Sequence, residues 1–146
     1  RMRGLIEAVE VGMLVTHGRN GEMLARPMRL RQFEGDRGIW FLSRRESRKV
    51  VNIEANPKVT VVFVDLDGNA YVSAHGRAAV EDSRDHVARL WSDQADSWFP
   101  EGKEDPGVVA LRIELDGGEY WDDVASTEIA IERKVKSGVH ADTDEH

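Results

Sequence analysis

Short apolar segments separated by glycine-containing turns dominate this chain, and they limit the folds open to it. Six segments have the alternation or apolar run of a β-strand, over residues 13–17, 23–33, 38–43, 59–66, 70–80 and 108–115. Parallel strands would each need a crossover helix, and the helical segments are too few to supply them. We therefore expect an α+β, mainly β fold, with an antiparallel sheet closed or half-closed into a barrel.

Four segments read as helices that flank this sheet. They cover residues 5–11, 46–55, 83–95 and a C-terminal stretch over 126–137. After Gly138 the sequence is polar and acidic and shows no periodicity, so residues 138–146 are predicted to be a disordered tail. The pattern thus predicts a single domain over residues 1–137.

Composition excludes several classes of function. The net charge of −7 would repel nucleic acid and anionic membranes, so neither is expected as a partner. The chain has no cysteine and no apolar run long enough to span a membrane, which predicts a cytoplasmic protein without disulfides. Its five histidines are scattered, so no metal site is expected, and no P-loop, GxGxxG or GxSxG motif is present.

A basic cluster at the start of a predicted helix is the most informative feature. Residues 43–49 read SRRESRK and gather four cations where a helix N-terminus already carries partial positive charge. A phosphate group would balance them, with Ser47, Arg48 and Lys49 as donors. The alternative is a capping box from Ser43 to Glu46 followed by solvated cations, and composition alone does not choose between the two.

Two further residues have an environment that suggests a ligand. Arg26 shares a strand face with apolar residues, so its guanidinium is expected either to meet a ligand anion or to pair with a carboxylate at the barrel mouth. Trp121 could lie against a planar ring, although such an indole is more often a core or dimer contact.

In combination and order, seven motifs resemble the pyridoxamine 5′-phosphate oxidase-like split-barrel flavoproteins, and most closely their short bacterial branch, the general stress protein 26 family. The resemblance covers roughly residues 3–125. The motifs are ARPMRL at 25–30, WFLS at 40–43, SRK at 47–49, NP at 56–57 leading into VTVVFVD, YVSAHGRA at 71–78, WFP at 98–100 and EYWD at 119–122.

This resemblance implies a fold and a cofactor site. The fold would be a six-stranded antiparallel split β-barrel of Greek-key type, forming a homodimer with two FMN sites at the subunit interface. By that likeness Arg26 would meet the ribityl phosphate region, Pro27 and Met28 would lie along the ring, and Phe41 and Leu42 would flank it. Ser47, Arg48 and Lys49 would hold the phosphate, while Tyr71 and Trp121 would come from the partner chain.

The sequence departs from the true oxidases of that family after the EYWD motif. The arginine and histidine with which those enzymes hold their vitamin substrate have no counterpart in residues 122–126, which read DDVAS. Pyridoxamine phosphate oxidase activity is therefore not expected. Arg31 occupies the position where the oxidases carry a lysine near the ring, so a basic residue beside the flavin is expected to persist.

Two functions follow from the resemblance. The first is an FMN-dependent oxidoreductase with a stress-related role, in which Arg26, Arg31 and Trp121 tune the flavin. The second is a flavin-binding protein that stores or senses the cofactor without turnover, because no catalytic acid or base is evident near the site. FAD, a deazaflavin or haem remain alternative ligands for the same barrel.

Overall fold

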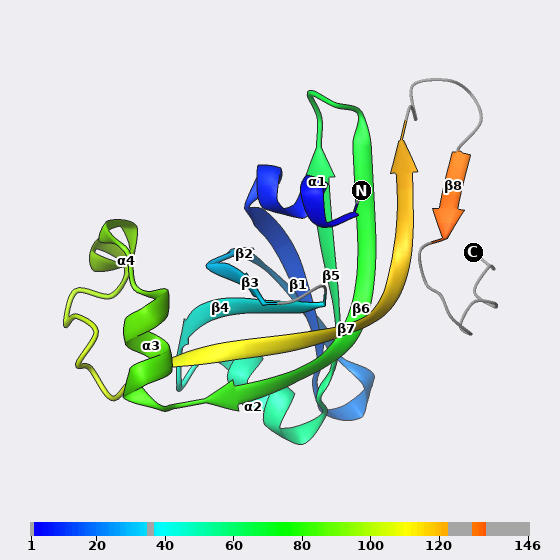
Figure 1. The fold of residues 1–146 in the computed structure, drawn as a ribbon. Helices are drawn as coiled ribbons and strands as arrows, with labels where there is room; N and C mark the ends of the chain where they lie inside the picture. The colour runs from blue at the N-terminus through cyan, green and yellow to red at the C-terminus, as the bar shows by residue number, and fades with distance from the viewer. Residues whose placement is uncertain (1, 35–36, 123–129, 134–146) are drawn as a thin grey trace.

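The computed structural model describes residues 2–34, 37–122 and 130–133, which form a curled antiparallel sheet with helices packed against it (Figure 1). The strand order is β2-β1-β5-β6-β7-β4-β3, and β8 also pairs with β7. The strands are β1 (Val11–His17), β2 (Met23–Arg29), β3 (Gln32–Glu34), β4 (Gly38–Arg44), β5 (Lys58–Asp65), β6 (Ala70–Glu81), β7 (Val108–Asp122) and β8 (Ala130–Arg133).

The mainly β fold with a half-closed antiparallel sheet is confirmed, but the sheet has more than the six strands expected. The strand predicted over 23–33 ends at Arg29, because the N–H of Arg31 donates to the carbonyl of Trp40 at 2.8 Å and the chain resumes as β3 along β4. The other addition is β8, a short strand beside the distal part of β7.

The helices pack at the ends and on one side of the sheet. They are α1 (Met2–Val9), α2 (Arg48–Ala55), α3 (Arg84–Leu90) and α4 (Asp93–Trp98). In Figure 1, α1 lies against the upper parts of β5 and β6, and α2 lies near the lower end of the sheet. Helix α3 lies beside the ends of β4 and β7, with α4 next to it. The single helix expected over 83–95 is in fact two, because the chain is extended at Trp91 and Ser92.

The helix predicted over 126–137 is wrong where the structure describes that segment. Residues Ala130–Arg133 form β8, with Ile131 opposite Trp121. An unpaired edge of β7 offers backbone hydrogen bonds that local helix preference does not. Residues 126–129 and 134–137 of that predicted helix lie outside the described residues. The predicted tail over 138–146 lies outside them as well.

The core fills the concave side of the sheet. Inward residues alternate along β1, β5 and β6, as the period of a strand requires. They are joined by Leu5 and Ile6 of α1 and by Val50 and Ile53 of α2, which close the two ends. A second, smaller apolar cluster holds α3 and α4 against β4 and β7.

The sheet remains split between the edge strand β2 and residues 41–44 of β4, the part of β4 that β3 does not cover. The two strands approach each other beside Arg31, and beyond that point an open seam lies between them. Helix α2 is fixed at one end of this seam, because Asn52 donates to the buried hydroxyl of Thr16 on β1 at 3.0 Å. The fold thus places the N-terminus of α2 beside the gap in the barrel.

Candidate functional site

A hollow of about 200 Å³ lies in this seam, and we call it the seam pocket. Its wall comes from the end of β2, from the segment that joins β4 to α2, and from the C-terminal end of α4. Of the residues predicted to bind a cofactor, six line it. The full wall is Pro27, Met28, Arg29, Arg31, Leu42, Ser43, Arg44, Ser47, Lys49, Trp98 and Phe99.

The start of α2 has an open N-terminus rather than a closed cap. The helix begins at Arg48, with Ser47 as its N-cap residue, and the Ser47 side chain makes no capping hydrogen bond. Its hydroxyl instead lies 3.2 Å from that of the buried Ser43. The alternative capping box from Ser43 to Glu46 is therefore wrong, and the Ser47 hydroxyl at the pocket wall can donate to a ligand.

Lys49 is a half-buried cation on the same wall. Burial lowers the pKa of Lys49 below its ordinary value, and the positive charge of Arg26 lowers it further. Both effects oppose a charge that lacks a compensating partner. Among the described residues no ion pair neutralises Lys49, so an anion in the pocket would relieve the penalty that its environment imposes.

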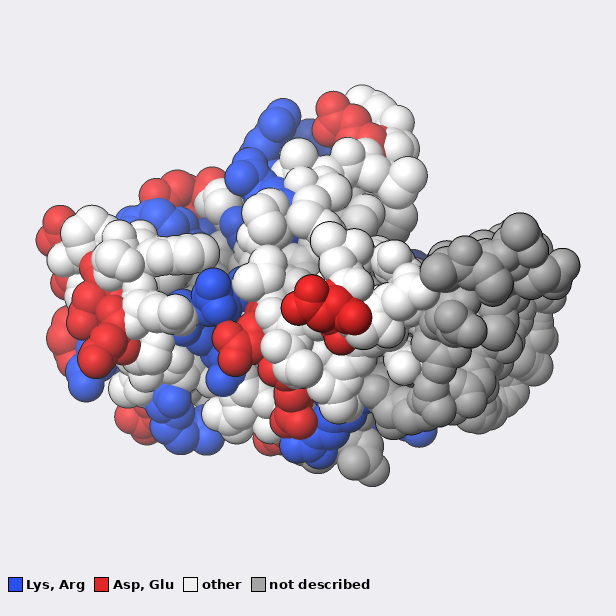
Figure 2. All heavy atoms as spheres, turned by 90° about the horizontal axis from the view of Figure 1, so that it is seen from above, with Lys and Arg blue, Asp and Glu red and all other residues white. Residues whose placement is uncertain are grey.

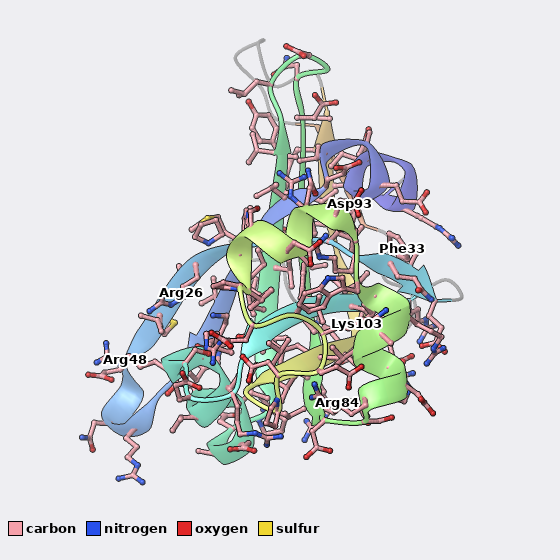
Figure 3. The ribbon with its side chains drawn as sticks, turned by 90° about the vertical axis from the view of Figure 1, so that its left-hand side faces the viewer. Arg26, Phe33, Arg48, Arg84, Asp93 and Lys103 are labelled. Atoms are coloured by element: carbon pink, nitrogen blue, oxygen red, sulfur yellow. The ribbon has the colours of Figure 1, made fainter. Side chains whose placement is uncertain are left out.

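Arg26 and Arg48 stand at the margin of the pocket rather than in its wall. Both are exposed, and Figure 3 shows them on the same side of the molecule, toward β2 and α2. Arg26 lies opposite the inward-facing Leu14, as its position in the alternation predicts, but β2 is an edge strand and the guanidinium reaches solvent. Each could approach a ligand from the rim.

Arg29 and Arg31 separate the seam pocket from a second hollow of about 410 Å³ under α1, β3 and the α3–α4 junction. Arg29 pairs with Glu10 at 3.1 Å, and Arg31 donates to the hydroxyl of Ser92 at 2.9 Å. Burial, and then the charge of Arg29, lower the pKa of Arg31. Arg31 therefore remains a cation whose bonded partner is neutral.

Trp98 and Phe99 are wall residues that the sequence reading did not name as part of the site. Phe99 is buried, whereas the indole of Trp98 is 56% exposed. The sequence feature that could have identified them is the motif WFP at 98–100. A motif at the end of a helix does not, however, show that its side chains face β2. Arg44 was missed as well, although it belongs to the basic cluster.

Phe41, in contrast, lies outside the pocket. Its side chain is fully buried in the barrel core, while the adjacent Leu42 faces the seam. Successive strand residues point to opposite faces, so only one of the pair can reach a ligand in this pocket.

Tyr71 and Trp121 also lie away from the seam pocket. They are cross-strand neighbours on β6 and β7, and Tyr71 pairs on its other side with Val64 of β5. These positions belong to the convex face of the sheet, opposite the core. Within one chain they do not contribute to the pocket wall.

The described part of the chain contains no cluster of three or more histidine or acidic side chains placed to hold a metal. Its helices are all too short or too polar to cross a membrane. Figure 2 shows acidic and basic side chains interspersed on the face seen from above, so this face does not present a field of a single sign.

Comparison with known proteins identifies relatives of the chain. Over 79 residues it is 35% identical to general stress protein 26 of Bacillus subtilis, an overlap that covers 52% of this chain and 56% of the relative. Protein bli-3 of Neurospora crassa is 24% identical over 117 residues, again 56% of that protein. The chain therefore spans little more than half the length of the curated relatives it matches.

Solved structures share the fold over nearly the whole length of both chains. A protein of Clostridium acetobutylicum related to general stress protein 26 superposes with a TM-score of 0.78 at 23% identity, covering 91% of this chain and 92% of that one. A general stress FMN/FAD binding protein of Xanthomonas citri gives a TM-score of 0.70 at 26% identity, covering 92% and 93%.

The sequence model of the family described as pyridoxamine 5′-phosphate oxidase like matches residues 1–145. This match takes in the seam pocket and every strand and helix described above. The chain belongs to the pyridoxamine 5′-phosphate oxidase-like family.

Proposed function

We propose that this protein binds FMN in the seam pocket and uses it as an oxidoreductase cofactor, with the phosphate held by Ser47, Arg48 and Lys49. The observation that carries the proposal is the wall itself. It contains four cationic side chains and not one carboxylate or imidazole. Carboxylates outside the wall pair with Arg29 and Arg44, whereas Arg31 and Lys49 have no ion-pair partner among the described residues. Such a wall favours an anion, and the N-terminus of α2 adds its own N–H donors.

The rest of the pocket suits a planar ring. Pro27, Met28, Leu42 and Phe99 supply an apolar surface next to the cations. Ligand sites typically combine such a surface with a few polar groups. A mononucleotide with a phosphate at one end and a three-ring system at the other matches this division, and a flavin binding protein of Xanthomonas citri has the same fold.

One chain encloses too little of such a ligand. The seam pocket holds about 200 Å³, below the roughly 300–1,000 Å³ of pockets that bury a whole small molecule. We infer that a second copy of the chain completes the site. The convex face is its proposed contact surface, because exposed apolar residues gather there and Tyr71 and Trp121 lie on it.

Bound flavin would supply hydride or electron transfer. The chain would bind the phosphate, shield one side of the ring and place the charge of Arg31 beside it. A positive charge near the ring stabilises negative charge there. The chain has no cysteine, which fits a reducing compartment, and we propose a cytoplasmic protein with a stress-related role.

The test is a titration of the purified protein with FMN, FAD and riboflavin, followed by absorption and fluorescence. We expect FMN to bind much more tightly than riboflavin, since only FMN carries the phosphate. Replacing both cations (Arg48→Ala with Lys49→Ala) should weaken FMN binding by about 1.5–3 kcal/mol for each charge-assisted hydrogen bond lost. Riboflavin binding should change little.

The matched control is Arg19→Ala with Lys103→Ala. These exposed residues lie in the turn after β1 and in the loop after α4, outside the pocket and off the convex face of the sheet, so the control changes net charge by the same amount. We expect it to retain FMN affinity. Equal affinity of the folded Arg48/Lys49 variant and the wild type for FMN would rule out this phosphate site.

A non-catalytic flavin carrier is the second candidate, favoured by one feature of the wall. Because the wall lacks a carboxylate and an imidazole, the pocket provides no conventional general acid or base. Steady-state oxidation of NADH or NADPH by the FMN-loaded protein would support the oxidoreductase. Saturable FMN binding with only a single slow turnover would favour the carrier.

A further inference from the structure

Arg84, the first residue of α3, is bonded in an unusual way for a surface-element arginine. Its guanidinium donates to four backbone carbonyls, those of Asp82, Lys103, Asp105 and Val108. The bond to Asp105 measures 2.8 Å and that to Lys103 measures 3.2 Å. Figure 3 shows Arg84 and Lys103 beside α3, away from Arg26 and Arg48. Arg84 thus fixes the path of the segment from 103 to 108.

Asp105 lies within that segment and connects it to the basic cluster through hydrogen bonds. One carboxylate oxygen accepts from the N–H of Gly107 at 2.8 Å, and the other accepts from Nη1 of Arg44 at 3.3 Å. The Asp105 side chain is 13% exposed. A Cβ added to Gly107 would lie 2.7 Å from Nη2 of Arg44, so the guanidinium is packed directly on this glycine.

The same segment holds the chain that leads into α2. The N–H of Arg45 donates to the carbonyl of Gly107 at 2.7 Å, and Arg45 also pairs with Asp82 at 3.2 Å. The carbonyl of Arg44 then accepts from the N–H of Ser47 at 3.1 Å and from the hydroxyl of Ser43. The contacts of Arg45 with Gly107 and Asp82 therefore hold the turn that places Ser47 in the wall of the seam pocket.

The opposite end of this loop forms another part of the pocket. Phe99 lines the wall, and its carbonyl accepts from Gly102, whose own carbonyl accepts from Asp105. Successive turns thus connect the aromatic wall at Phe99 with the anchor at Asp105. Arg84 is bonded to the backbone between these two points.

We propose that Arg84 and Asp105 are positioning residues for the phosphate end of the ligand site, acting through Arg44 and the turn at Ser47. Neither residue lines the pocket. A planar fork that donates to fixed carbonyls holds a loop more rigidly than an ammonium group can, and binding groups need such support to keep a productive geometry. The proposal rests on the FMN site proposed above.

The experiment compares FMN with riboflavin in the full chain carrying Arg84→Lys or Asp105→Asn. We expect the affinity for FMN to fall about ten- to hundredfold, the effect of losing one charge-assisted hydrogen bond, while riboflavin affinity stays nearly constant. Substitution of a residue that only supports the fold would lower the affinities for FMN and riboflavin by the same factor. Asp105→Asn preserves the side-chain shape and keeps the test valid if Arg84→Lys does not fold.

Arg112→Lys is the matched control, since Arg112 is also half-buried and makes two ion pairs, to Glu34 and Glu114. It should preserve the preference for FMN. Unchanged preference in both test variants, or equal loss for both ligands, would overturn the positioning role. A wild-type protein without any preference for FMN over riboflavin would instead contradict the proposed phosphate site itself.

Discussion

The two faces of strand β5 differ sharply although their residues alternate along one segment. The inward Phe63 is fully buried, whereas its neighbour Val64 is 40% exposed. Several outward residues are nonetheless apolar: Met13 of β1 lies between Pro27 and Val62 in the pairing of adjacent strands. A sheet face that meets only water normally carries polar residues at these positions.

This difference separates two roles of apolar residues in the same strands. Those on the concave face hold the barrel together in one chain. Those on the convex face stay partly exposed in one chain, and the dimer proposed above would bury them against a second copy. The comparison therefore predicts that substitutions on the two faces will affect different measurements.

The largest expected effect is on the concave face. Phe63→Ala should lower the free energy of unfolding by about 3–5 kcal/mol, because it removes a fully buried ring and leaves a cavity. Val64→Ala, one residue further, should change it by about 0.5 kcal/mol or less, as expected for an exposed position. Urea denaturation at low protein concentration measures both. Equal effects would contradict the assignment of faces.

Substitutions on the convex face should have an intermediate effect, on the stability of the proposed dimer. Val62→Glu should raise the dissociation constant of the dimer at least about tenfold, because it places a charge in an apolar contact. Sedimentation or light scattering over a dilution series measures this. Ala88→Glu, on the exposed side of α3, adds the same charge elsewhere and should leave the mass unchanged. A dimer equally stable in both variants would reject the convex face as the contact.

The smallest effect concerns the seam, where the two faces meet. The environment of Lys49 lowers its pKa below the ordinary value of about 10.4, and a bound phosphate should raise it again. FMN affinity should therefore be highest while Lys49 is protonated and should fall as the pH rises through this lowered pKa. Lys49→Arg should retain its affinity to higher pH, because arginine stays protonated.

Riboflavin is the control for that titration, since it has no phosphate for Lys49 to meet. Its affinity should not follow the same pH dependence. Circular dichroism at each pH establishes that the fold persists. An identical decline for FMN in Lys49→Arg and the wild type would mean that Lys49 does not contact the phosphate.

Much of the architecture was predictable from the alternation of apolar and polar residues. The inward set Ala70, Val72 and Ala74 of β6, and the end of α2 before Pro57, follow directly from periodicity and proline chemistry. The C-terminal segment was not predictable in this way. The residues around 130–133 favour a helix, yet residues 130–133 pair with the edge of β7. The sequence within this segment does not indicate that pairing partner.

The candidate site was predictable only in part. The cluster at Ser47 and Lys49 stood out because cations are unfavourable at a helix N-terminus. Neither the wall at Trp98 and Phe99 nor the support from Arg84 has a local signature. Each depends on the loop after α4, whose Asp105 meets Arg44 of β4 at a separation of 61 residues along the chain. Phe41 was named with Leu42, although strand geometry sends the two to opposite faces.

The sequence by itself determined the class of fold, the position of the basic turn and the family, because periodicity and motif order are properties of neighbouring residues. Only the tertiary structure decided that the barrel is split between β2 and β4, that the seam holds the pocket, and that Arg84 braces the turn at Ser47. These features depend on contacts between segments distant in the chain, and such contacts arise from packing of the whole domain rather than from local preference.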